Sequence, residues 1–172
     1  MMRSRQLLLR RTRAFFSAVL FAASLTCFST ASQATEIAVV ASPDVSLKQV
    51  DHSALRRIFL KKKLTDQHHT PLIPVNLPTI HPVRAAFSRA VLGESAKATA
   101  RYWNKQYFLG VSPPYVLDSQ EAVLRFVRET PGSIGYVLDC LADDRVQILF
   151  RIKISASLRD KLNPFCVQSG QH

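Results

Sequence analysis

The chain has 172 residues, with 23 Lys and Arg against 12 Asp and Glu, and its formal net charge is +11 at pH 7. Part of this charge lies at the extreme N-terminus, where Arg3, Arg5, Arg10, Arg11 and Arg13 occur without an acidic residue. The rest of the chain is only moderately basic, which predicts anionic partners such as small oxyanions, phospholipids or envelope polymers and argues against a nucleic-acid-binding protein.

The first 34 residues show the order of segments that is typical of a secretory signal peptide. The basic stretch is followed by an apolar run at 14–28 and then by small and polar residues that end in Ser32, Gln33 and Ala34. This run is shorter than the roughly 20 residues that span a bilayer, and no later segment is long and apolar enough to do so. We predict cleavage after Ala34 and export to the periplasm.

The remaining residues have the length of a single domain with one hydrophobic core. The apolar run at 37–40 predicts a strand buried on both faces. Asp51 is placed to cap a helix that ends in the three lysines at 61–63, where positive charge is favourable. Residues 71–76 predict a strand whose prolines suit a sheet edge.

Three helices and two strands are predicted next, at residues 82–92, 95–109, 118–130, 133–138 and 146–152. Asp118 and Glu121 form a variant of a capping box at the start of the third of these helices. Because strands alternate with helical segments, we expect an α/β domain, a sheet flanked by helices, over residues 35–162. Residues 163–172 are predicted to be a loose tail.

Several segments together resemble a known family: residues 55–62 (LRRIFLKK), 74–78 (PVNLP), 82–87 (PVRAAF), 102–104 (YWN), 108–110 (FLG) and 131–136 (PGSIGY). In this order they are similar to short proteins related to the phosphate-binding component of ABC transporters. The resemblance covers residues 37–149 and implies a type 2 periplasmic binding protein-like fold. It also implies phosphate or a related oxyanion as ligand, although the chain has length for little more than one of the two lobes of such proteins.

Two residues depart from the phosphate loop that the resemblance implies. The family places an Arg after the strand, and Leu77 occupies that position here. In the family a turn of small residues then begins the helix, whereas Pro82 lies at the position of that turn here. Leu77 cannot make a bidentate contact with an anion, and Pro82 has no N–H to donate, so the inherited site is largely lost at the level of side chains.

The same loop still contains the best candidate ligand residues. Thr79 and His81 precede the predicted helix and Arg84 lies in its first turn, where an anion would favour a cation and the free N–H groups. Alternatively, Arg84 pairs with a carboxylate or extends into solvent, and His81 is a helix cap. Ser42 follows the first strand, where α/β folds tend to place ligands, although the position suits a turn residue better.

Other reactive side chains carry weaker signals. Cys140 and Cys166 remain after leader cleavage and form a disulfide in an oxidising compartment, unless one is buried and the other is free. His68 and His69 are adjacent, so both side chains cannot easily ligate one metal, and we expect no metal site or cofactor. No nucleophile or paired-carboxylate motif is present, and we expect no enzymatic activity.

Two functions remain open. The first is a periplasmic solute-binding-like protein that recognises phosphate or another small oxyanion as part of an ABC uptake system, or as a descendant of one. The second is an envelope interaction module that kept the fold, lost the ligand and binds a membrane-protein or signalling partner. A second copy of the chain is a candidate to complete the missing cleft as a homodimer.

Overall fold

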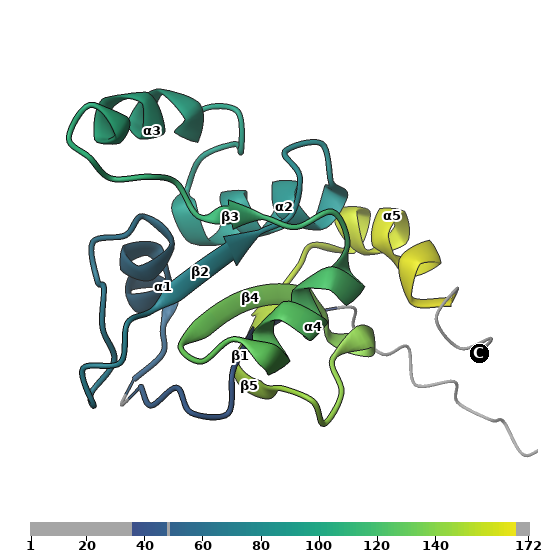
Figure 1. Ribbon diagram of the computed structural model, residues 1–172. Helices are drawn as coiled ribbons and strands as arrows, with labels where there is room; N and C mark the ends of the chain where they lie inside the picture. Colours follow the sequence, from purple (N-terminus) through teal and green to yellow (C-terminus); the bar gives the residue numbers. More distant parts are fainter. Residues whose placement is uncertain (1–35, 48, 168–172) are drawn as a thin grey trace, which may run out of the picture. The chain divides into compact units, whose positions relative to one another are not determined.

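The structure is a computed structural model, and it describes residues 36–47 and 49–167 (Figure 1). The predicted leader and the last residues of the predicted tail, 168–172, lie outside the described residues. In the part of the chain that is described, no helix is both long and apolar enough to cross a membrane.

A five-stranded mixed sheet organises the described residues, with strand order β3-β2-β4-β1-β5. Its strands are β1 (Glu36–Ala41), β2 (Ile73–Asn76), β3 (Tyr115–Val116), β4 (Ser133–Leu138) and β5 (Gln147–Lys153). β2 is parallel to its neighbours β3 and β4, whereas β1 is antiparallel to both β4 and β5. The predicted α/β sheet flanked by helices is therefore confirmed.

Helical segments connect the strands (Figure 1). They are α1 (His52–Phe59), α2 (Pro82–Phe87), the π-helical turn η1 (Ser88–Leu92), α3 (Thr99–Tyr107), α4 (Gln120–Glu129), the 3-10 turn η2 (Asp139–Leu141) and α5 (Ala156–Val167). Asp51 caps α1 as predicted, accepting a hydrogen bond from the Ala54 N–H. The cap of α4 was predicted wrongly: the Ser119 hydroxyl, not Asp118, accepts from the Ala122 N–H.

The core lies between the sheet and the helices. Residues 37–41 of β1 have no exposed surface, which agrees with the predicted strand that is buried on both faces. The rings of Phe87 from α2 and Tyr136 from β4 stack with 3.8 Å between their centroids, and Phe59 from α1 packs against both. This aromatic cluster joins two helices to the central strands.

The turn before β4 requires a glycine. Gly132 has a φ of +75°, and a Cβ atom there would lie 2.1 Å from the backbone oxygen of Pro71. Its N–H donates to the Asp44 carboxylate at 3.0 Å. The turn thus brings the chain before β2 and the chain after β1 to the start of β4.

Helix α5 extends into the region predicted as a loose tail. Residues 163–167 are helical, so the expectation of a loose tail from 163 onward is wrong for these five positions. Two contacts explain why the helix continues through these residues. Leu162 is fully buried in the core, and Cys166 is joined to Cys140 of η2 by a disulfide with 5.8 Å between the Cα atoms. Pro164 lies within this helix without preventing its formation.

Candidate functional site

The loop that follows β2 lies at the edge of the sheet where β2 and β4 end. Of the candidate residues, Thr79 is exposed and His81 is partly buried. The His81 Nδ1 atom accepts a hydrogen bond from the Val83 N–H at 3.2 Å, and burial lowers the pKa of its imidazole. His81 is therefore a neutral helix cap here and occupies one of the N–H groups that an anion would need.

Arg84 points into the protein rather than toward solvent. Its side chain is 7% exposed, and its Nη1 atom donates to the Leu77 carbonyl at 3.5 Å. Its Nε atom is buried and has no hydrogen-bond partner. None of the described carboxylates forms an ion pair with it, so this guanidinium is a buried charge without a counter-ion, an arrangement that is costly in a folded protein.

Polar groups surround Arg84 on the core side. The Tyr136 hydroxyl donates to the Asn76 side-chain oxygen at 3.2 Å and accepts from the Leu77 N–H at 3.3 Å. Burial raises the pKa of this hydroxyl to about 12, against smaller opposing effects of the Arg84 charge and of hydrogen bonds from the Leu77 N–H and the Arg84 side chain. Tyr136 is therefore a neutral hydrogen-bonding group at neutral pH and supplies no negative charge to balance Arg84.

Ser42 lies at the other edge of the sheet. Because β1 is antiparallel to β4, its last residue Ala41 pairs with Ile134 near the start of β4, and the Ser42 N–H donates to the Ser133 carbonyl at 3.0 Å. The structure therefore does not bring Ser42 together with the loop containing Thr79, His81 and Arg84. Its hydroxyl is buried without a hydrogen-bond partner.

A cavity of about 360 Å³ opens beside α2, between this helix, η1, the end of β5 and the start of α5. The sequence analysis did not identify it. Its lining combines three cations, two hydroxyls and four small or apolar side chains: Arg89, Lys153, Lys161, Ser155, Ser157, Ala86, Ala90, Ile154 and Leu158. We call it the basic cavity. Its three cations lie in η1, at the end of β5 and in α5, and their positions in the sequence do not reveal spatial proximity.

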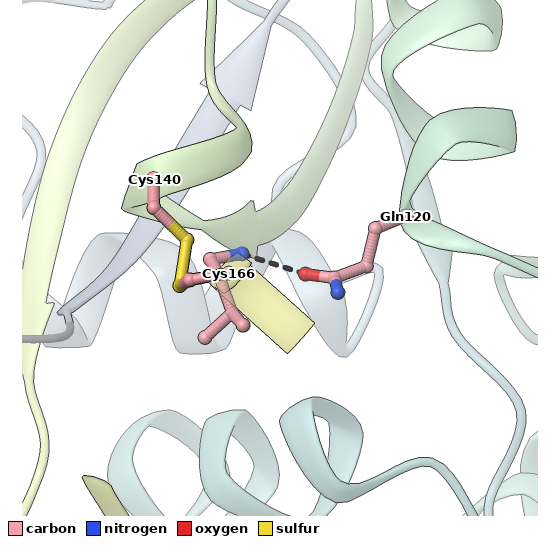
Figure 2. The surroundings of a disulfide bond; sticks show 4 residues. Gln120, Cys140 and Cys166 are labelled. Carbon is pink, nitrogen blue, oxygen red and sulfur yellow. Dashed lines mark hydrogen bonds between the residues drawn. A yellow bond between two sulfur atoms is a disulfide. The ribbon is translucent and has the colours of Figure 1, made fainter. Parts of the chain in front are cut away.

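The disulfide holds the helix that forms one wall of the basic cavity (Figure 2). Near it, the buried Gln120 side chain accepts a hydrogen bond from the Leu138 N–H at 2.7 Å, which satisfies the end of β4 (Figure 2). Next to Cys166 in α5, the ring of Phe165 contacts that of His81 with 5.7 Å between centroids. α5 therefore joins η2 to the loop after β2.

Within the described residues, no group of three or more His, Cys, Asp or Glu side chains is arranged to hold a metal ion. His68 and His69 are both exposed, and they follow Asp66, whose carboxylate accepts from the N–H groups of Ser46, His68 and Thr70. These hydrogen bonds, led by the one from Ser46, lower the pKa of Asp66. This loop is organised by a carboxylate that binds backbone groups.

Solved structures share the fold. One is a protein assigned as a phosphate ABC transporter substrate-binding protein from Clostridium perfringens, with bound phosphate; it is 18% identical, with a TM-score of 0.55 over 67% of this chain. Another is an ABC-type phosphate transport receptor from Vibrio cholerae, 15% identical, with a TM-score of 0.52 over 67% of this chain. The resemblance predicted from sequence is confirmed at the level of the fold.

This chain spans less than half of those proteins, matching 44% of the Clostridium chain and 45% of the Vibrio chain. No protein-family model matches the sequence, and neither does any curated protein. These similarities concern the fold alone.

Proposed function

We propose that this protein is a solute-binding-like protein of the bacterial envelope that recognises phosphate or a related small oxyanion, and that it is not an enzyme. Two proteins with the same fold are described by their phosphate binding or phosphate transport. The observation that carries the proposal is Arg84, a buried guanidinium that has no carboxylate partner among the described residues and an Nε atom without an acceptor.

An oxyanion beside Arg84 would supply the negative charge and the hydrogen-bond acceptor that this side chain lacks in the folded protein. Its oxygens would accept from the Nε atom and balance the buried charge, and such charge-assisted hydrogen bonds are stronger than neutral ones. Thr79 is exposed in the loop after β2 and offers a hydroxyl donor. Because Arg84 is 7% exposed, the loop containing Thr79 and His81 must open for the anion to enter. Ser42 takes no part, since it lies at the opposite edge.

Calorimetric titration tests this proposal. The chain is titrated at low salt with phosphate and sulfate, with chloride as control. We expect saturable binding of an oxyanion that weakens about tenfold or more in Arg84→Met, because a hydrogen bond to a charged group contributes about 1.5–3 kcal/mol. Arg101→Met, on the exposed face of α3, is the matched control and should bind as the parent does. Equal affinity of Arg84→Met and the parent would contradict the proposal.

Export and partners belong to the same proposal. We propose that residues 1–34 are removed on secretion, so the periplasmic protein begins at Thr35. Intact mass measurement of protein recovered from the periplasm tests this, and an unprocessed mass would contradict it. A short chain needs a second surface to enclose an anion, which an inner-membrane transporter, a signalling protein or a second copy would supply. Light scattering with and without phosphate separates a homodimer from a monomer.

The alternative function is an interaction module without a ligand, and one surface favours it. Tyr107, Phe108 and Leu109 at the end of α3 are 69%, 87% and 67% exposed. Leu77, buried where the resemblance implies an Arg, supports the loss of a ligand. A photo-crosslinking residue placed at 108 in cells would capture a protein partner under this alternative. The absence of a crosslinked protein, together with a saturable heat signal on titration with phosphate, would favour the solute-binding function.

A further inference from the structure

We propose that the basic cavity is a second binding site, distinct from the Arg84 site, for a molecule that carries a phosphate group on a short apolar chain. The ligand class follows from the lining, in which cations and hydroxyls face a wall of apolar side chains. The inference goes beyond the proposed recognition of a free oxyanion and does not depend on it.

The charge in the basic cavity is unbalanced. Arg89, Lys153 and Lys161 all line it, and no carboxylate does. Glu36 lies opposite Lys153 in the β1–β5 pairing, but none of the three side chains forms an ion pair or hydrogen bond with another residue in the described ranges, whereas the side chains of Arg145 and Arg151 elsewhere on the surface do so. Converging like charges repel one another and raise the local potential for anions. A dianionic phosphate group at their centre would relieve this repulsion.

Hydroxyl groups add donors beside the cations. Ser155 and Ser157 line the cavity at the point where the chain leaves β5 and enters α5, and their hydroxyls lie 3.3 Å apart. Both side chains are exposed, so they can rotate toward a ligand. Together with the three cations they form a set of donors with no acidic acceptor, which suits a phosphate.

The size and the apolar wall favour a ligand larger than inorganic phosphate. The cavity volume of about 360 Å³ lies within the range of roughly 300–1,000 Å³ that is usual for small-molecule sites. Ala86, Ala90, Ile154 and Leu158 supply a surface that cannot hydrogen-bond. An alkyl group joined to the phosphate would cover this surface and gain hydrophobic stabilisation.

The two sites lie on different sides of one helical segment. Arg84 is buried and directed to the Leu77 carbonyl, whereas Arg89 in η1 is exposed and faces the basic cavity. The far wall of the cavity is α5, and its position is set by the disulfide and by the contact between Phe165 and His81. Substitutions can therefore address each site separately.

Titration with n-hexyl phosphate tests the inference, with inorganic phosphate and hexanol as separate arms. In the Arg84→Met variant, where the other proposed oxyanion site is lost, we expect hexyl phosphate to bind about tenfold or more tightly than either, because both the charge and the alkyl group contribute. Vesicles containing phosphatidic acid form a further arm, which separates a soluble alkyl phosphate from a bilayer as its source. Binding of hexyl phosphate or of the vesicles supports the site if the affinity also depends on Lys153 and Lys161.

The double variant Lys153→Ala/Lys161→Ala should weaken that binding at least tenfold. The double variant Lys97→Ala/Lys105→Ala removes the same charge from two exposed residues, one in the turn before α3 and one in α3, and should bind as the parent does. Arg84→Met should retain hexyl phosphate binding even where it loses free phosphate, so the two proposals can fail independently. The inference is overturned if hexyl phosphate and vesicles both fail to bind, or if both lysine pairs have equal effects.

Discussion

Removing the disulfide between Cys140 and Cys166 should lower stability without changing the fold. The two residues are separated by 26 positions, and in the chain-entropy description closing a loop of that length destabilises the unfolded state by about 3.5 kcal/mol. In the folded state Leu162 stays buried in the core, so α5 should remain docked in Cys140→Ser/Cys166→Ser. A domain of this size is stable by about 5–15 kcal/mol, so the expected loss is a large fraction of the total.

Urea denaturation followed by circular dichroism and by fluorescence of Trp103 measures the effect. With a slope of about 1–3 kcal/mol per molar urea, the unfolding midpoint should fall by roughly 1–3 M. Reductant should shift the parent protein by a similar amount and leave the double variant unchanged, which controls for the two substitutions themselves. A double variant that unfolds within about 0.5 kcal/mol of the oxidised parent would refute the reasoning.

Three further predictions concern the scaffold. Gly132→Ala should destabilise the protein by about 2 kcal/mol or more in urea denaturation, because of its positive φ and the clash with the Pro71 carbonyl; an unchanged midpoint would contradict the assigned turn. Gln120→Leu should cost about 1–3 kcal/mol, since it leaves the buried Leu138 N–H without an acceptor, and faster hydrogen exchange at that amide would report the loss. The pKa of Asp66 is lower when folded than when unfolded, so its stabilisation is present above the ordinary carboxyl pKa of 3.8 and is lost as the pH falls through the folded pKa. Asp66→Asn should flatten the acid limb of the stability curve, and an unaltered limb would show that other carboxylates control it.

Much of the fold follows from patterns of apolar residues. The buried strand at 37–40 and the capped helix after Asp51 were predicted, because burial and capping leave local signals. The direction of β1 was not, since the same apolar run suits a parallel or an antiparallel neighbour. The prediction for Ser42 depended on that direction, and the antiparallel pairing places this residue at the opposite edge of the sheet.

The candidate site was predicted less well than the fold. Arg84 was identified, but its position in the first turn of a helix does not show whether the guanidinium points outward or toward the Leu77 carbonyl. The basic cavity depends on Arg89, Lys153 and Lys161, which come from three separate parts of the chain. Their convergence depends on the tertiary structure and on the disulfide that positions α5, and the spacing of these residues along the sequence does not predict it.

The place of β1 in the sheet has a consequence for how the domain is made. β1 is the first strand of the described residues, yet both of its partners, β4 and β5, come late in the chain. Pairings between distant segments form slowly because a long loop must close first. A nascent chain that emerges N-terminus first therefore exposes an unpaired apolar strand until nearly the whole domain has followed. Residues 37–41 of β1 therefore acquire their complete burial only late in folding.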